Sequence, residues 1–430
     1  MRFLSVIFPC ALVAAMAIAQ QPSTTREVPQ AEGEPVGELT LEQILSLAAG
    51  RNPDIAASES EIRAREGRLQ QAGTRPNPEL SGTTENLGGD IADTGGRQTT
   101  LELQQRLELG GDREARVAAA GAQRDLARWD LQSRRRDVAR RATRAFIDVL
   151  SAQRRLELGD AAVQLTEEVR STVAARVEAG KVSPIEETRA EVALATERIE
   201  RERAAADLAG ARSRLAVTWG STTPRFDRVI GDLDAMPVLP SLDSVVAQIE
   251  ASPEVARWTA EIAEREALLR VERSRAVPDI TLGGGYRRFE LGSNAFVATV
   301  GLPLPLFDRN RGAQIEARER IATAQQERRS ASVRLRQSVD ETYTSVARAQ
   351  GEVRNLREQV VPGAESVYAA VSEGYRLGKF GYIEVLDARR TLAAVRAQLL
   401  RAQTELQRTF ADLQRLIAAS MNNISNGEQQ

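Results

Sequence analysis

The sequence predicts a mainly α-helical fold with a small β-barrel, in which each chain contributes long helices and four transmembrane β-strands. Three observations lead to this prediction. Long stretches without glycine or proline, at 122–158, 313–350 and 382–420, are rich in good helix formers. Two segments alternate apolar and polar residues as strands do, and each has a partner segment across a glycine-containing turn. The chain is also an internal duplication, and its two halves repeat one order of elements.

The composition argues against most catalytic chemistry. The 430 residues include no histidine and one cysteine, Cys10, and the formal net charge is −2. A His-dependent triad, a His/Cys zinc site and a cysteine nucleophile are therefore excluded from the mature chain. Carboxylate pairs such as Glu186-Glu187 lie on expected surface helices without a pocket motif. We expect no enzyme, no metal site and no cofactor, and the near-zero net charge gives no reason to expect a nucleic-acid partner.

The first residues are typical of a secretory signal peptide. Arg2 precedes an apolar run, and Ala17-Ile18-Ala19 supplies a small-residue cleavage site, so 1–19 are predicted to be removed. Cys10 would leave with them. Lipid attachment at Cys10 is disfavoured because the residues before it, Ile7-Phe8-Pro9, are not small. Residues 20–38 are expected to form an extended N-terminal segment.

The duplication sets the domain boundaries. Asn52–Ala56 matches Ser252–Ala256 about 200 residues later, and Gly180-Lys181 matches Gly378-Lys379. Lys181 and Lys379 are the only lysines of the chain and occupy equivalent positions. We therefore predict a first repeat at 39–238, a second at 239–420 and a disordered tail at 421–430.

Each repeat is expected to contain two shorter helices, a strand pair and a long helical hairpin. In the first repeat the expected ranges are helices 40–50 and 54–74, strands 77–87 and 97–109, and long helices 112–178 and 184–218. In the second repeat they are helices 241–251 and 254–275, strands 278–291 and 295–306, and long helices 310–376 and 382–418.

The long helices call for an unusual setting. A helix over 112–178 would be about 100 Å long at 1.5 Å per residue. Small apolar residues dominate its expected buried positions, as in Ala118–Ala120 and Ala142. Small side chains favour close helix approach in a hollow helical barrel, whereas a solid antiparallel coiled coil, the alternative, usually has regular Leu and Ile in its seam.

The strands are amphipathic. Leu101, Leu103, Leu107 and Leu109 share one face, and even-numbered residues from Phe296 to Leu306 form another apolar face. Such strands suit a transmembrane β-barrel with a wet lumen, although a hairpin packed on a soluble core would show the same pattern. Four strands cannot close a barrel, and open edges in lipid would leave backbone groups unpaired. Three chains would supply twelve strands.

At this point the sequence resembles the TolC family of outer-membrane efflux proteins, over about 39–418. The most specific stretch is Gly374–Leu392, which is similar to the family's second hairpin turn, and Arg75-Pro76-Asn77-Pro78 resembles the entry to its first strand pair. Leu107–Arg113, LELGGDR, is similar to the strand-to-helix junction of the CzcC/CusC-like heavy-metal efflux branch. The resemblance implies a homotrimer with a 12-stranded β-barrel in outer-membrane lipid and a 12-helix α-barrel in the periplasm. It also implies two partners, a periplasmic adaptor (membrane fusion protein) and an inner-membrane RND-type transporter.

The resemblance further implies roles for residues at the periplasmic end. Glu384 and Asp387 match the family's acidic rings at the constriction, and their spacing of three places both carboxylates on one helix face. Tyr375 and Glu186 match the network that holds this end closed. One residue departs from the pattern, because Phe380 stands where relatives can carry an arginine of that network. The alternative for the carboxylates is that they are ordinary solvated charges on an Arg/Glu-rich coil.

We also expect the hairpin tips, with Gly180, Lys181, Gly378 and Lys379, to dock the adaptor; a coincidence within two Gly-Lys turns is the alternative. The predicted function is the exit duct of a tripartite efflux pump, passively conducting divalent heavy-metal cations. A duct for organic compounds and a periplasmic coiled-coil scaffold are the alternatives.

Overall fold

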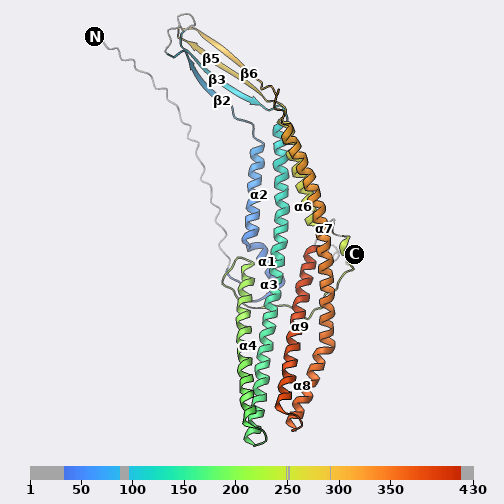
Figure 1. The fold of residues 1–430 in the computed structure, drawn as a ribbon. Helices are drawn as coiled ribbons and strands as arrows, with labels where there is room; N and C mark the ends of the chain where they lie inside the picture. Colours follow the sequence, from blue (N-terminus) through green and yellow to red (C-terminus); the bar gives the residue numbers. More distant parts are fainter. Residues whose placement is uncertain (1–32, 88–95, 248, 250–251, 291, 418–430) are drawn as a thin grey trace, which may run out of the picture.

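The computed structural model describes residues 33–87, 96–247, 249, 252–290 and 292–417. The expected signal peptide at 1–19, Cys10, most of the segment 20–38 and the tail 421–430 lie outside these residues. The described chain is elongated, with one β-sheet at one end and two helical turns at the other (Figure 1).

The described part of the first repeat contains four helices besides its strands. They are α1 (Leu41–Arg51), α2 (Pro53–Ala72), α3 (Asp112–Glu178) and α4 (Pro184–Val217). Local caps explain several starts. Thr40 forms a capping box with Gln43 at the start of α1. Asn52 caps α2, which begins at Pro53, because its Oδ1 accepts hydrogen bonds from the backbone N–H groups of Asp54 and Ile55.

The second repeat contains α5 (Leu242–Val246), α6 (Pro253–Ser274), α7 (Arg311–Asn355), α8 (Val361–Arg376) and α9 (Tyr382–Ile417). Ser252 caps α6 as Asn52 caps α2, which matches the sequence duplication. The long helix expected over 310–376 is helical from Arg311 to Arg376, but a π-helical turn, η2 (Leu356–Val360), interrupts its α-helical hydrogen bonding between α7 and α8. Pro362 follows directly and lacks an N–H group, so the wider turn lies where the regular helix loses a hydrogen bond.

Four strands form an antiparallel sheet in the order β2-β3-β5-β6. They span Glu79–Glu85, Gln98–Leu107, Ile280–Phe289 and Asn294–Gly301. Leu101 pairs with Tyr286, and Tyr286 with Phe296, so large apolar residues of neighbouring strands share one exposed face. Gly285 lies on the other face, where a Cβ would approach the Leu101 carbonyl oxygen to 2.7 Å.

The last strand is shorter than expected. β6 ends at Gly301, whereas the apolar alternation had suggested a strand to 306. Pro303 and Pro305 explain the difference, since proline has no N–H group to donate to a strand ladder.

Two strands were not expected at all. β1 (Val36–Thr40) and β4 (Arg225–Ile230) pair in parallel near the middle of the molecule. Residues 36–38, expected to be only extended, therefore belong to a strand. Both strands bury side chains against α1, α3 and the end of α4, where Trp219 meets Phe226 edge to face at 6.1 Å.

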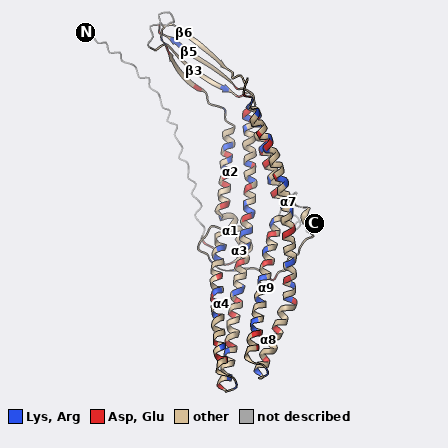
Figure 2. Cartoon of the chain, viewed as in Figure 1, with Lys and Arg blue, Asp and Glu red and all other residues tan. Residues whose placement is uncertain are grey.

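The long helices form one curved layer. α4 packs on α3, α3 on α9, and α9 on α8, so that α4 and α8 lie at the two edges (Figure 1). Many buried positions of α3 are small, including Ala115, Ala119, Ala120 and Ala142. Charges of both signs are interspersed along the helices (Figure 2). Among the described helices, none is both long and apolar enough to cross a bilayer.

Candidate functional sites at the two ends of the helical layer

The two hairpin turns have the same backbone design. Gly180 and Gly378 adopt φ values of 66° and 76°, a left-handed conformation that glycine accepts without a Cβ penalty. The N–H of Lys181 donates to the Arg176 carbonyl at 2.9 Å, and that of Lys379 to the Gly374 carbonyl at 2.8 Å. These are Schellman caps, which satisfy the last carbonyls of α3 and α8. Both lysines lie exposed just beyond the cap.

Tyr375 joins the two hairpins of one chain. It is 3% exposed and packs with Val173, Ala190, Tyr382 and Val385, which come from α3, α4 and α9. Its hydroxyl donates to Glu186 Oε2 at 3.4 Å, so the structure brings together the two residues suggested by the resemblance. The contact lies between α8 and α4 of the same chain.

Arg176 completes this network, although no sequence pattern singled it out. Its guanidinium lies 4.3 Å from the centre of the Tyr375 ring and donates to the Tyr375 carbonyl. Burial, followed by the negative charge of Glu186, raises the pKa of Tyr375 to about 12. The raised pKa favours the neutral phenol, so its hydroxyl remains a donor until the pH rises through about 12.

Glu384 and Asp387 are exposed on the first turns of α9. Within the described part of the chain, neither carboxylate has a hydrogen bond or an ion pair. They are three residues apart and therefore on one helix face, and they lie at the same end as both turns. Unpaired, solvated carboxylates can attract passing cations without holding them.

Phe380 packs where the resemblance would place an arginine. A Cβ on Gly374 would lie 2.2 Å from Cδ2 of the Phe380 ring, so glycine leaves the space that the ring occupies. The network at the turns thus contains an aromatic contact at this position, while Arg176 supplies a cation from the other hairpin.

A buried ion pair lies deeper along α9. Arg389 Nη1 contacts Glu197 Oε1 of α4 at 3.0 Å and donates to Thr166 Oγ1 of α3. The Arg389 side chain is only 9% exposed. Sequence reasoning missed this residue, although it continues the buried stripe of Tyr382, Val385 and Leu392, where a charge is unusual.

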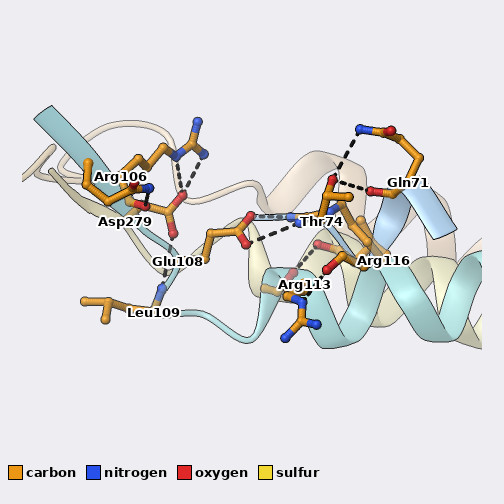
Figure 3. A network of polar contacts seen from close by, with 12 residues as sticks. Gln71, Thr74, Arg106, Glu108, Leu109, Arg113, Arg116 and Asp279 are labelled. Carbon is orange, nitrogen blue, oxygen red and sulfur yellow. Dashed lines mark hydrogen bonds and ion pairs between the residues drawn. The ribbon is translucent and has the colours of Figure 1, made fainter. Parts of the chain in front are cut away.

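The opposite end of the helical layer is fastened by a second polar network (Figure 3). Arg106 of β3 pairs with Asp279 at 2.6 Å, and Asp279 also accepts the N–H of Leu109. Glu108 pairs with Arg116 of α3 through both carboxylate oxygens, an interaction that raises the pKa of Arg116. Arg113 donates to the carbonyl of Gly73 at the end of α2. Leu107–Arg113 therefore joins the sheet to three neighbouring segments.

We expect Gly110→Ala to loosen this junction. Its Cβ would lie 2.6 Å from the Ser274 carbonyl oxygen and 3.0 Å from Val277 Cβ, and backbone cannot yield as a flexible side chain can. The expected destabilisation is about 1–3 kcal/mol, measured by denaturant unfolding of the purified channel.

Gly121→Ala is the matched control, because nothing described lies within 4 Å of its Cβ and alanine favours the surrounding helix α3. Equal stability of the two variants would contradict a packing role for Gly110.

No group of three or more His, Cys, Asp or Glu residues within the described part of the chain is placed to hold a metal ion.

Comparisons with known proteins agree along nearly the whole chain. The family described as "Outer membrane efflux protein" matches residues 44–221 and 246–419. The chain is 36% identical to the cobalt-zinc-cadmium resistance protein CzcC of Cupriavidus metallidurans, over 89% of this chain and 91% of that protein. It is 30% identical to the nickel and cobalt resistance protein CnrC of the same species, over 72% of each. Its fold is similar to that of a membrane protein from Pseudomonas aeruginosa, with a TM-score of 0.75, 19% identity, and coverage of 88% and 92%.

Proposed function

Because the chain belongs to the outer membrane efflux protein family, we propose that it is the exit duct for divalent metal cations in a tripartite pump. The protein is an outer-membrane channel, and its helical barrel lies in the periplasm. The role is passive conduction, which needs no catalytic residue and no cofactor.

The observation that carries the metal assignment is the likeness to CzcC, whose name states cobalt-zinc-cadmium resistance, over most of both chains. The unpaired carboxylates of Glu384 and Asp387 are compatible with this cargo, because negative charge at an opening favours cations over anions. A weak interaction suits a passage that must release the ion.

The complete channel is a trimer in this proposal. The sheet has two open edges, β2 and β6, which the membrane cannot tolerate unpaired, and three copies would give twelve strands. The helical layer supports the same assembly. Ile185, Val192 and Ile199 of α4 are 57%, 62% and 51% exposed at heptad spacing. On the opposite edge, Val360 and Val367 are exposed seven residues apart and would face α4 of the next copy.

Loss of the gene should sensitise the bacterium that carries it to cobalt, zinc and cadmium but not to organic toxicants. Growth inhibition is measured with and without a plasmid-borne copy, and native mass spectrometry of the purified channel checks the trimer. Sensitivity to organic toxicants alone would replace the metal assignment with an organic-compound duct.

The exposed tips are proposed to dock the periplasmic adaptor, with an inner-membrane RND-type transporter beneath it. Lys181→Glu combined with Lys379→Glu should weaken adaptor binding, because both residues lie beyond the turns that a periplasmic partner reaches first. Binding to the purified adaptor is measured by surface plasmon resonance at low salt, where charge effects are largest.

Arg318→Glu with Arg329→Glu is the control, since it makes the same charge change on exposed residues of α7 far from the turns. Equal binding by the tip variant and this control would refute the docking role.

A further inference from the structure

The segment that follows β6 exposes a run of apolar side chains. Leu302, Leu304 and Leu306 are 48%, 67% and 66% exposed, and Phe307 is fully exposed. We call Leu302–Phe307 the junction collar. Contiguous apolar surface of this kind marks a contact with another molecule or with lipid.

The first repeat handles the corresponding segment differently. Leu107–Asp112 is tied to the protein through the Glu108–Arg116 pair and the close packing of Gly110 on Ser274. Within the described residues, by contrast, the junction collar has backbone polar contacts only with itself and Arg309: Leu306 donates to the Leu304 carbonyl and Arg309 to the Pro305 carbonyl. The described chain therefore leaves this junction apolar and uncovered.

The position of the junction collar points to lipid. It begins one residue after Gly301, where β6 ends, and it leads from the sheet into α7 (Figure 1). Phe296 and Val300 of β6, 92% and 72% exposed, belong to the apolar face of the sheet. Since the helices lie in the periplasm, the junction collar continues this apolar face towards the periplasmic boundary of the membrane.

A second copy of the chain is a poorer occupant than lipid. β6 is an edge strand, and a neighbouring copy would cover it by pairing with its backbone. Pro303 and Pro305 have no N–H groups, so that pairing cannot continue along the junction collar. Aromatic residues are enriched where barrels meet the membrane interface, and Phe307 has this placement.

Cationic side chains follow the apolar ones at once. Phe307, Arg309 and Arg311 line part of a hollow of about 350 Å³ at the start of α7. Arg311 has no ion pair in the described part of the chain, and Arg309 uses only its Nε on the Pro305 carbonyl. Asp308 also lines the hollow, with Oδ1 accepting the Asn310 N–H at 2.8 Å. The hollow therefore offers two guanidinium groups beside an apolar surface, which matches a lipid phosphate above its acyl chains.

We propose that the junction collar anchors the channel in the periplasmic leaflet of the outer membrane, with acyl chains on Leu302–Phe307 and an anionic phospholipid headgroup on Arg309 and Arg311. This surface has no part in conducting the cargo. It fixes the depth at which the barrel ends and the helices begin.

Tryptophan fluorescence tests the apolar half of the proposal. Phe307→Trp is reconstituted into vesicles whose phosphatidylcholine is brominated near the glycerol end of the acyl chains, and the parent protein supplies the background from Trp129, Trp219 and Trp258. We expect blue-shifted emission that loses most of its intensity to the bromines. Leu377→Trp, at the periplasmic turn, should be quenched by aqueous iodide instead.

Two outcomes would overturn this assignment. Quenching of Phe307→Trp by iodide alone means that the junction collar faces water, and quenching by neither agent means that protein covers it. Ion conductance of the same vesicles shows whether the barrel has inserted. Absence of lipid contact at the junction collar is thereby distinguished from absence of a working channel.

The headgroup is tested with brominated phosphatidylglycerol in place of brominated phosphatidylcholine. The anionic lipid should quench Phe307→Trp more strongly at equal mole fraction, and Arg309→Glu with Arg311→Glu should abolish the difference. Arg318→Glu, two turns further along α7, should preserve it. If the two brominated lipids quench Phe307→Trp equally when Arg309 and Arg311 are both intact, the anionic headgroup site is refuted.

Discussion

Replacing Glu384 and Asp387 by Gln and Asn is expected to remove most of the cation preference of the channel. Both carboxylates are exposed and unpaired in the described chain, and three copies would place six of them around one opening. Charge of one sign in a constricted passage raises the local counter-ion concentration by about tenfold or more. The measurement is the reversal potential of single channels in a planar bilayer under a salt gradient.

Salt supplies an internal check on this result. The screening length falls from about 10 Å at 0.1 M to about 3 Å at 1 M, so parent and variant should converge as salt rises. Glu316→Gln with Glu319→Gln, another exposed pair three residues apart but on α7, is the matched control. Unchanged selectivity in the α9 variant would mean that these carboxylates are ordinary solvated charges.

Removing Arg389 is expected to cost about 3 kcal/mol of stability and to loosen the periplasmic end. Arg389→Met leaves Glu197 without its cation in a site where that side chain keeps 21% exposure, so the effect falls at the low end for a broken buried pair. Glu384 and Asp387, which are proposed to line the constriction, also lie on α9. If α9 is held less tightly to α3 and α4, the constriction should widen and the single-channel current should rise. Denaturant unfolding and single-channel recording measure the two effects.

The double variant Arg389→Met, Glu197→Leu separates charge from packing. Apolar replacement of both partners of a buried pair is often neutral or stabilising, so stability should return towards the parent value. Arg396→Met, which breaks an exposed pair with Glu365, is the control and should cost about 0–1 kcal/mol. Equal losses for Arg389→Met and Arg396→Met would show that the ion pair at Arg389 does not join the hairpins.

Local sequence signals predicted the long elements well. The bounds of α3 follow from a run of good helix formers between Gly111, at φ 74°, and the Schellman cap at Gly180. Asn310, at φ 55°, stands at the same place before α7, and asparagine is among the few other residues that tolerate this conformation. Such signals need only neighbouring residues.

What the sequence did not predict depends on distant contacts. β1 and β4 are short and pair across nearly the whole first repeat, so neither has a strong pattern of its own. The overestimate of β6 came from counting side-chain alternation without the missing N–H groups of Pro303 and Pro305.

The candidate site likewise combines features that neighbouring residues determine with features that depend on distant contacts. The turns and their glycines could be located from the sequence, and the resemblance suggested Tyr375 with Glu186. Arg176 and Arg389 looked like two more arginines on Arg-rich helices, and only the meeting of α3, α4, α8 and α9 gives them partners.

The π-helical turn makes the two repeats structurally unequal. α3 runs without interruption from the sheet to its turn, whereas the corresponding helix of the second repeat is divided at Leu356–Val360. A trimer would thus present six Gly-Lys tips of two alternating kinds. Three would follow the unbroken helix α3, and three would follow α8, which is separated from α7 by the π-helical turn. A partner that contacted all six tips of such a trimer would therefore meet two classes of tip in alternation.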